Sequence, residues 1–381
     1  MNQQASDDDQ HRLSMTTTLY QEGRPTISVA GEAGSRCPEE LLSRYGEIVE
    51  GGRLNWTEYH HLTRRLGAGG QGVVFLTTRR GSDGFTLPVA LKIFSPERYD
   101  SEPLYDEAMS RIAKVSARVA QIQHDNLLDV QNFVEQRRIR VMEMEWIDGY
   151  DLSRLLAPEL LARTRASVSD ERWRYLNNVI VTAGPQQSRL KPGVAIAIVR
   201  ECLAALAALH RDGIVHGDIK SSNIMVKRTG NAKIIDIGSA LALDDIPPNR
   251  TCTPSYAAPE VLEGRENTPR SDLASLGYVL IEMLSGQPPF AGLQSYRDLL
   301  EAKRSLVHRL PQLLPSEVAC NELLMNFCRG MIAADPTRRF LSAEDADLVK
   351  EGAASFHRQL IVGGLASEYE NEIRAWLEEL D

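Results

Sequence analysis

Short β-type runs and longer helical patterns occupy separate stretches of this 381-residue sequence. Residues 72–77 and 88–94 carry β-branched and aromatic residues between turn signals, which predicts a small antiparallel sheet. Apolar residues then recur at three-to-four spacing, the mark of helices, in four later stretches: 102–123, 194–210, 272–285 and 319–332. Because strands come first and helices afterwards, the order predicts an α+β fold rather than an alternating parallel sheet.

The two ends of the chain differ in composition from this body. Residues 1–55 are rich in Ser, Thr, Asp, Gly and Gln, and such a segment buries too little apolar surface to offset the entropy of ordering. We therefore expect a mostly disordered N-terminal tail. Residues 346–381 are expected to form a helical extension that either caps the body or binds a partner. Its apolar positions are Leu360, Ile361, Ile373, Trp376 and Leu377.

Charge and cysteine content bear on location and partners. With 52 acidic and 43 basic residues, the net charge of -9 gives no overall attraction to nucleic acid. The polar, acidic start does not resemble a signal peptide, and Arg200 and Glu201 interrupt the longest apolar stretch, so we expect no membrane span. Five scattered cysteines form no C-x-x-C pair, which favours a reducing compartment. We expect a cytoplasmic protein.

A glycine-rich turn leads into the first β-type run, residues 72–77. Residues 67–72 read Gly-Ala-Gly-Gly-Gln-Gly, and glycines let a backbone approach phosphate groups closely. A Rossmann turn would open a helix, whereas residues 73–76 continue as a strand. Twenty residues after Gly72, Lys92 ends an apolar strand, where its ammonium could contact two phosphate groups. The pattern favours a glycine-rich hairpin over a phosphate chain.

Residues 216–223, His-Gly-Asp-Ile-Lys-Ser-Ser-Asn, bring three chemical functions together. Asp218 offers a carboxylate, Lys220 an ammonium and Asn223 a carboxamide. Phosphoryl transfer needs an acceptor for a hydroxyl proton, a cation for developing charge and an oxygen ligand for Mg²⁺. Asp236 adds a second carboxylate thirteen residues after Asn223, behind an apolar pair. The spacing predicts two facing loops that carry out phosphoryl transfer.

These motifs make residues 60–345 resemble the eukaryotic-type (Hanks-type) serine/threonine protein kinase family. Residues 253–260 resemble the segment that closes the activation loop, and residues 271–277 resemble the helix beneath the catalytic loop. Arg339 stands where the family pairs an arginine with a glutamate, here Glu260. The resemblance implies a bilobal fold, with a small antiparallel β N-lobe that has one main helix and a larger, mostly helical C-lobe.

The resemblance also implies domain limits. It gives a kinase domain over residues 56–345, composed of an N-lobe (56–144), a hinge (145–149) and a C-lobe (150–345). Compared with the family, the C-lobe is longer over about residues 163–191. We expect this insertion to be either a tolerated surface loop or a docking site for a substrate or partner.

Residue roles carried over from the family give an ATP and Mg²⁺ site. Asp218 would be the catalytic base and Lys220 would stabilise the transferred phosphoryl group. Lys92 would hold the α- and β-phosphates, and Asn223 and Asp236 would bind magnesium.

The nucleotide position follows from the same resemblance. Residues 144–149 resemble the hinge, where the Glu145 carbonyl and the Ile147 N–H would meet the adenine edge, with Met144 as gatekeeper. Val74, Ala90 and Met225 match the apolar positions that sandwich the adenine ring. The other residues assigned to nucleotide binding are Leu66, Gly67, Ala68, Gly69, Gly70, Gln71 and Gly72.

Two positions depart from the family pattern. In the family, the lysine pairs with a glutamate of the N-lobe helix, and we expect Glu107, fifteen residues after Lys92, to fill this role. Counting back from His124 puts Val115 there instead, so the pair could be missing and Glu107 could face solvent. Gly217 replaces the arginine that usually receives a phosphorylated residue, so we expect activation-loop phosphorylation not to be obligatory.

Lys220 and Thr253 accompany aliphatic-hydroxyl substrates in the family, so we expect transfer to protein serine or threonine, including autophosphorylation. Aminoglycoside and choline kinases also have a His-Gly-Asp loop, which leaves a small-molecule phosphotransferase as an alternative. Residues 258–260 argue against it, because those enzymes lack this segment. A catalytically inactive kinase-like scaffold is the second alternative. A regulatory partner could bind through the tails or the insertion.

Overall fold

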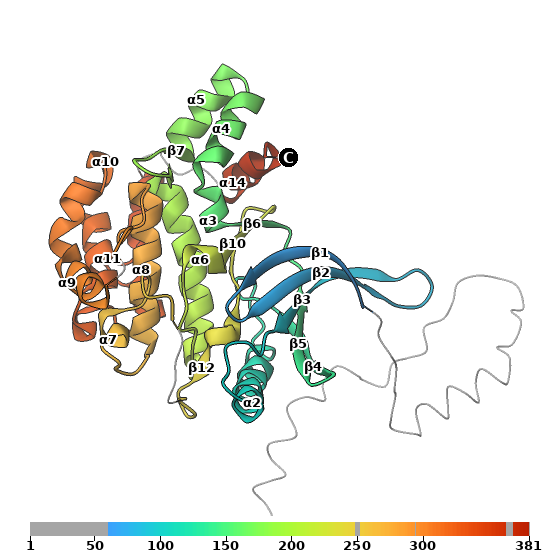
Figure 1. Cartoon of the computed structure of the whole chain (residues 1–381). Helices are drawn as coiled ribbons and strands as arrows, with labels where there is room; N and C mark the ends of the chain where they lie inside the picture. Colours follow the sequence, from blue (N-terminus) through green and yellow to red (C-terminus); the bar gives the residue numbers. More distant parts are fainter. Residues whose placement is uncertain (1–59, 248–251, 294, 363–368, 381) are drawn as a thin grey trace, which may run out of the picture. The chain divides into compact units, whose positions relative to one another are not determined.

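The computed structural model describes residues 60–247, 252–293, 295–362 and 369–380, all within the compact unit Glu58–Asp381 (Figure 1). The predicted tail, residues 1–55, lies outside the described residues.

A five-stranded antiparallel sheet opens the described chain. Its strands are β1 (His60–Gly69), β2 (Gly72–Arg80), β3 (Thr86–Phe94), β4 (Val130–Gln136) and β5 (Ile139–Glu145), in the order β1-β2-β3-β5-β4. Gly72 has φ of 140°, and a Cβ there would lie 2.0 Å from the carbonyl oxygen of Ile93. Only glycine therefore allows β2 to leave the turn so close to β3.

One helix, α2 (Glu102–Val119), packs against this sheet. A proline in its first turn favours the start, because the N–H that proline lacks would have no partner there. Tyr105 and Met109 are buried, and the Tyr105 hydroxyl accepts a hydrogen bond of 2.9 Å from the backbone N–H of Arg140 on β5. These contacts fix which face of α2 meets the sheet.

The region after the sheet is mostly helical. Its centre is α6 (Pro192–Arg211) beside α8 (Pro269–Ser285), which is buried along almost its whole length. Helices α11 (Glu322–Ile332) and α12 (Ala343–Leu348) pack against this pair. Helices α9 (Tyr296–Leu313) and α10 (Ser316–Ala319) pack in turn on α11, and α7 (Pro259–Leu262) packs on α9. This order, an antiparallel sheet followed by a helical region, confirms the predicted α+β class and the bilobal kinase-like architecture (Figure 1).

Helix α6 is apolar on nearly all sides, as expected for a helix in a protein core. Among the described residues it is the one helix long and apolar enough to cross a bilayer, and 72% of the relevant stretch is buried within the protein. Burial of this kind makes it weak evidence for a membrane span.

Short strands connect the sheet to the helical region, and they flank the loops that contain residues 216–223 and Asp236. A three-stranded sheet joins β6 (Gly149–Asp151), β10 (Ile224–Lys227) and β11 (Ala232–Ile234) in the order β11-β10-β6. A second pair joins β9 (Ile214–Val215) to β12 (Leu241–Ala242). The loop 216–223 thus lies between β9 and β10, and Asp236 lies between β11 and β12.

The predicted insertion and the C-terminal extension contact one another. The insertion region contains α4 (Pro158–Ser167), α5 (Asp170–Val179), β7 (Val181–Ala183) and β8 (Ser188–Leu190), and the extension contains α13 (Ala353–Val362) and α14 (Tyr369–Glu378). Arg172 of α5 forms an ion pair with Glu379, and Trp376 of α14 is buried (Figure 1). The extension therefore caps the body through the insertion.

Candidate active site

The catalytic loop is held from below by a buried carboxylate. Asp272 of α8 accepts hydrogen bonds of 2.9 Å from the backbone N–H groups of His216 and Gly217. His210, at the end of α6, contacts the same carboxylate through Nε2 at 2.9 Å. Because these bonds are to the backbone, they fix the path of the loop whatever its side chains do.

Gly217 has a conformation that explains why no side chain stands there. Its φ is 74°, in the left-handed region that favours glycine. A Cβ at this position would lie 3.0 Å from the carbonyl oxygen of Ser239. The close approach of the loop to Ser239 therefore explains why glycine stands where the family has arginine.

The Asp218 carboxylate contacts Lys220 of its own loop and Thr253 of the segment 253–260. Lys220 Nζ donates to Asp218 Oδ2 at 2.7 Å, and the Thr253 hydroxyl donates to Oδ1 at 2.7 Å. Lys220 Nζ also lies 3.0 Å from the Thr253 hydroxyl oxygen. An aliphatic hydroxyl is thus held between the predicted base and the predicted cation.

Asp236 faces this loop and contacts Lys92. Its Oδ1 accepts from Lys92 Nζ and from the backbone N–H of Gly238. Burial alone would raise the pKa of Asp236, but the Lys92 ammonium and the N–H of Gly238 hold it below its ordinary value. Asp236 is therefore an ionised carboxylate, and the following Ile237 is buried as an apolar plug.

The predicted pairing of Lys92 with Glu107 is wrong. The Glu107 side chain is 60% exposed and accepts a hydrogen bond of 2.6 Å from Arg111, one turn along α2. The physical reason is helix register: with Tyr105 and Met109 buried against the sheet, Glu107 lies on the solvent side. Val115, the alternative obtained by counting from His124, is buried.

A cavity of about 630 Å³ lies under the glycine-rich turn, which is a size typical of ligand pockets. Apart from Glu107, every residue assigned to catalysis, nucleotide or metal binding lines it. These residues are Leu66, Gly67, Ala68, Gly69, Gly70, Gln71, Gly72, Val74, Ala90, Lys92, Met144, Glu145, Ile147, Asp218, Lys220, Asn223, Met225 and Asp236. The fold thus brings together segments that are up to 170 residues apart in the sequence.

The side chain of Glu145 has a structural task of its own. It accepts from Lys233 of β11 and from the backbone N–H of Asp129 at 2.7 Å. These contacts hold the hinge segment against the strand that leads to Asp236. The backbone of residue 145, whose carbonyl group the resemblance assigned to adenine, is positioned by this anchoring.

Asn223 and Asp236 offer the donor set of a magnesium site. Asn223 Nδ2 donates to the Asp218 carbonyl oxygen at 2.8 Å, so its amide oxygen is directed away from that bond. A carboxylate and a carboxamide oxygen are hard ligands, and Mg²⁺ usually takes only one or two protein oxygens besides phosphates and water. The residues present therefore fit magnesium.

A buried ion pair anchors the segment that follows Thr253. Arg339 donates to Glu260 through Nη1 at 2.6 Å and Nη2 at 2.7 Å, and both side chains are buried. This bidentate geometry is the strong form of an arginine–carboxylate contact. The predicted Glu260–Arg339 pair is confirmed.

Sequence reasoning missed Ser239 and the contacts of the Gln71 side chain. Ser239 lines the cavity and accepts a hydrogen bond of 2.9 Å from Gln71 Nε2. Gln71 Oε1 in turn accepts from Lys92 Nζ at 2.7 Å. Gln71 was assigned only as part of the glycine-rich turn, because nothing in the local pattern connects it with residues 92 and 239.

Comparisons with known proteins agree with this geometry. The chain is 30% identical over 308 residues to the serine/threonine-protein kinase PknD of Mycobacterium tuberculosis, covering 79% of this chain and 40% of PknD. It is 29% identical over 303 residues to PknH of Mycobacterium bovis, covering 78% of this chain and 44% of PknH. This chain therefore spans less than half the length of these relatives.

A family model described as the protein kinase domain matches residues 60–347. That range contains the glycine-rich turn, Lys92, the catalytic loop, Asp236 and the Glu260–Arg339 pair. The chain therefore belongs to the protein kinase family.

Proposed function

We propose that the protein is a serine/threonine kinase that transfers the γ-phosphoryl group of Mg-ATP to a protein hydroxyl, including hydroxyls of its own chain. The observation that carries this proposal is the Thr253 hydroxyl held 2.7 Å from Asp218 and 3.0 Å from Lys220. It supports an aliphatic hydroxyl as the acceptor, and the printed names of PknD and PknH point to the same class.

In this proposal Asp218 accepts the proton of the attacking hydroxyl. Its carboxylate is 11% exposed and already accepts a hydroxyl hydrogen bond, which is the geometry that a general base needs. Lys220, 2.7 Å from Asp218, places a cation where negative charge develops. Both side chains are therefore held in position before a substrate binds.

Lys92, Asn223 and Asp236 act on the phosphate side. Lys92 is almost completely buried, so its ammonium is directed into the cavity as a fixed cation for phosphate oxygens. Asn223 and Asp236 would hold magnesium, which when bound neutralises charge on the phosphate chain. Adenine would lie between Val74, Ala90 and Met225.

Two alternatives differ in the acceptor or in the chemistry. A small-molecule phosphotransferase would share the His-Gly-Asp loop, but the buried Glu260–Arg339 pair supports an ordered segment beside Asp218 that suits a protein acceptor. A catalytically inactive scaffold would need a broken site, whereas Lys92, Asp218, Asn223 and Asp236 share one cavity. The scattered cysteines support a cytoplasmic location as part of the proposal.

The test is transfer of labelled γ-phosphate from Mg-ATP, with the chain itself, a generic protein and an aminoglycoside as acceptors. Asp218→Asn should lower transfer to protein by about 10²- to 10⁴-fold, the usual contribution of a general base. Asp170→Asn, at an exposed position of α5, is the matched control and should retain activity. Label on the aminoglycoside alone would favour the first alternative, and no label with any acceptor would favour the scaffold.

A further inference from the structure

The Lys92 ammonium is buried and takes its partners from two loops. Its side chain is 6% exposed, and Nζ contacts Asp236 Oδ1 and Gln71 Oε1. Within the described part of the chain, no contact joins Lys92 to an acidic residue of α2. We propose that Gln71 positions Lys92 for nucleotide phosphates, in place of a helix α2 carboxylate; this inference rests on the proposed function.

The acidic residues of α2 are not in a position to serve Lys92. The sequence of this helix contains three, Glu102, Asp106 and Glu107, all in its first two turns. Glu102 and Asp106 form ion pairs with Arg138, and Glu107 pairs with Arg111. From residue 108 onward α2 has basic, polar and apolar residues but no acid.

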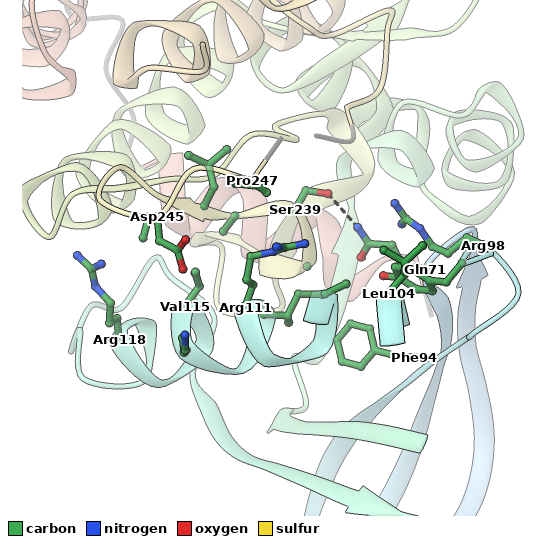
Figure 2. A pocket seen from close by; sticks show the side chains of 18 of the residues that line it. Gln71, Phe94, Arg98, Leu104, Arg111, Val115, Arg118, Ser239, Asp245 and Pro247 are labelled. Atoms are coloured by element: carbon green, nitrogen blue, oxygen red, sulfur yellow. Dashed lines mark hydrogen bonds between the residues drawn. The ribbon is translucent and has the colours of Figure 1, made fainter. Parts of the chain in front are cut away.

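The face of α2 nearest to the segment after Asp236 is apolar and basic. A cavity of about 530 Å³ separates the two, and Ala108, Arg111, Ile112 and Val115 line it from the α2 side. Figure 2 shows Arg111 and Val115 on this helix, with Gln71 and Ser239 on the opposite wall. Arg111 is a second cation on this face of α2, and its partner is Glu107, one turn away on the same helix. The Glu107 carboxylate is therefore engaged by Arg111 and not by Lys92.

Gln71 is fixed at both ends of its amide group. Its Oε1 accepts from Lys92 at 2.7 Å while its Nε2 donates to Ser239 Oγ at 2.9 Å, the contact drawn in Figure 2. The two bonds define the orientation of the amide, since the donor and the acceptor cannot be exchanged. Gln71 therefore links the glycine-rich turn, Lys92 and the segment after Asp236.

The backbone leaves room for this contact. A Cβ on Gly238 would lie 2.1 Å from Gln71 Oε1 and 2.8 Å from Lys92 Nζ. Glycine at 238 is thus what allows the amide and the ammonium to meet beside Asp236. A site in which three segments fit this closely is pre-organised rather than incidental.

The Gln71 contact would still hold Lys92 if Asp236 bound a metal ion. A long lysine side chain loses rotamer entropy when it is fixed. A neutral acceptor such as Gln71 keeps the ammonium in place without cancelling its charge, so the charge remains available to phosphate oxygens. Gln71 is in this sense a positioning residue that acts through Lys92.

The experiment is a double-mutant cycle on Mg-ATP binding and on kcat/KM for ATP. Gln71→Met keeps the side-chain length but removes both hydrogen bonds, and it should lower ATP affinity and kcat/KM by about 10- to 100-fold, as expected for a hydrogen bond to a charged group. Gln71→Glu keeps an acceptor for Lys92, but it loses the bond to Ser239 and adds a negative charge close to Asp236, so its loss should be smaller than that of Gln71→Met. In a Lys92→Ala background, Gln71→Met should cause no further loss.

Gln121→Ala, on an exposed residue at the end of α2, is the control and should match wild type. The proposal is overturned if Gln71→Met binds Mg-ATP as tightly as wild type or more tightly, if Gln71→Glu is as impaired as Gln71→Met, or if the losses at 71 and 92 add. A wild-type chain that binds Mg-ATP but transfers no phosphate would contradict the proposed function alone. Failure to bind Mg-ATP at all would contradict both.

Discussion

The catalytic loop and the surroundings of Lys92 obtain their geometry in different ways. In the loop, Asp218, Lys220 and Asn223 contact one another within six residues, and Asp272 holds their backbone. Lys92 instead depends on Gln71, from another strand turn, and on Asp236, 144 residues away. A short motif thus encodes the first region, whereas the second depends on how separate elements pack.

The largest effect should come from breaking the pair that anchors the catalytic side. Arg339→Leu leaves Glu260 charged, buried and unpaired, which should lower the free energy of unfolding by about 3–5 kcal/mol. Denaturant unfolding measures this loss. Arg329→Leu, at an exposed position of α11, is the control and should stay within about 0.5 kcal/mol. A loss below about 1 kcal/mol for Arg339→Leu would show that the catalytic side does not depend on this partner.

Lys303 of α9 is a buried lysine in the helical region, and no sequence motif indicates it. It therefore tests whether a buried lysine outside the motifs also keeps its charge. Its Nζ donates to the Ser255 carbonyl oxygen at 2.7 Å and lies 3.9 Å from the ring centre of Phe290. Burial lowers the pKa of Lys303 to about 7, whereas in the unfolded chain a lysine pKa is about 10.4. Between these values the unfolded state binds more protons, so stability rises with pH.

The Lys303→Met variant lacks this titration. Relative to the variant, wild type should therefore gain up to about 1.4 kcal/mol of unfolding free energy per pH unit between pH 7 and 9. Denaturant unfolding of both proteins across this range measures the difference. Parallel stability curves would mean that Lys303 keeps its proton in the fold.

A smaller effect is expected at Gly217. Gly217→Ala puts a side chain in the left-handed region and 3.0 Å from the Ser239 carbonyl oxygen, and it should cost about 2 kcal/mol. Gly264→Ala has a similar φ of 77° but nothing within 4 Å of the new Cβ, so it should cost about 1 kcal/mol. Calorimetric unfolding of both variants separates backbone conformation from contact. Equal losses would remove Ser239 from the explanation of the Gly217 departure.

The smallest effect is expected at Glu107, which tests whether Lys92 depends on helix α2. Because Glu107 is exposed and pairs with Arg111 one turn away, Glu107→Ala should change unfolding free energy by less than about 0.5 kcal/mol. Phosphate transfer and ATP affinity should remain within about twofold of wild type. A tenfold loss of kcat/KM would show that Glu107 reaches Lys92 during the reaction, against the geometry described above.

Much of the fold and of the catalytic loop could be predicted because local sequence encodes them. β-Branched and aromatic residues between turn signals predicted strands at β2 and β3, and helical spacing predicted α2, α6, α8 and α11. Residues 216–223 carry their chemical groups within one short loop. Glu107 could not be placed correctly, since its role depends on which face of α2 the buried Tyr105 and Met109 select. Gln71 was assigned to the glycine-rich turn, but its contact with Lys92 could not be predicted, because its partners belong to other elements.

The junction of the insertion with the C-terminal extension was equally hidden. Arg172 and Glu379 form an ion pair across 207 residues of sequence, and neither lies in a recognisable motif. Amphipathic spacing predicted that residues near 373–377 form a helix, but it left open what that helix covers. Packing of α14 against α6 and its ion pair with α5 settle that question in the folded chain.

The proposed serine/threonine kinase activity is tested most directly by phosphoamino-acid analysis. Protein is labelled with γ-phosphate from Mg-ATP by wild type and by Asp218→Asn. Wild type should yield phosphoserine or phosphothreonine, and the variant should show a loss of about 10²- to 10⁴-fold. Equal labelling by both proteins, or label confined to a small molecule, would contradict the proposed activity.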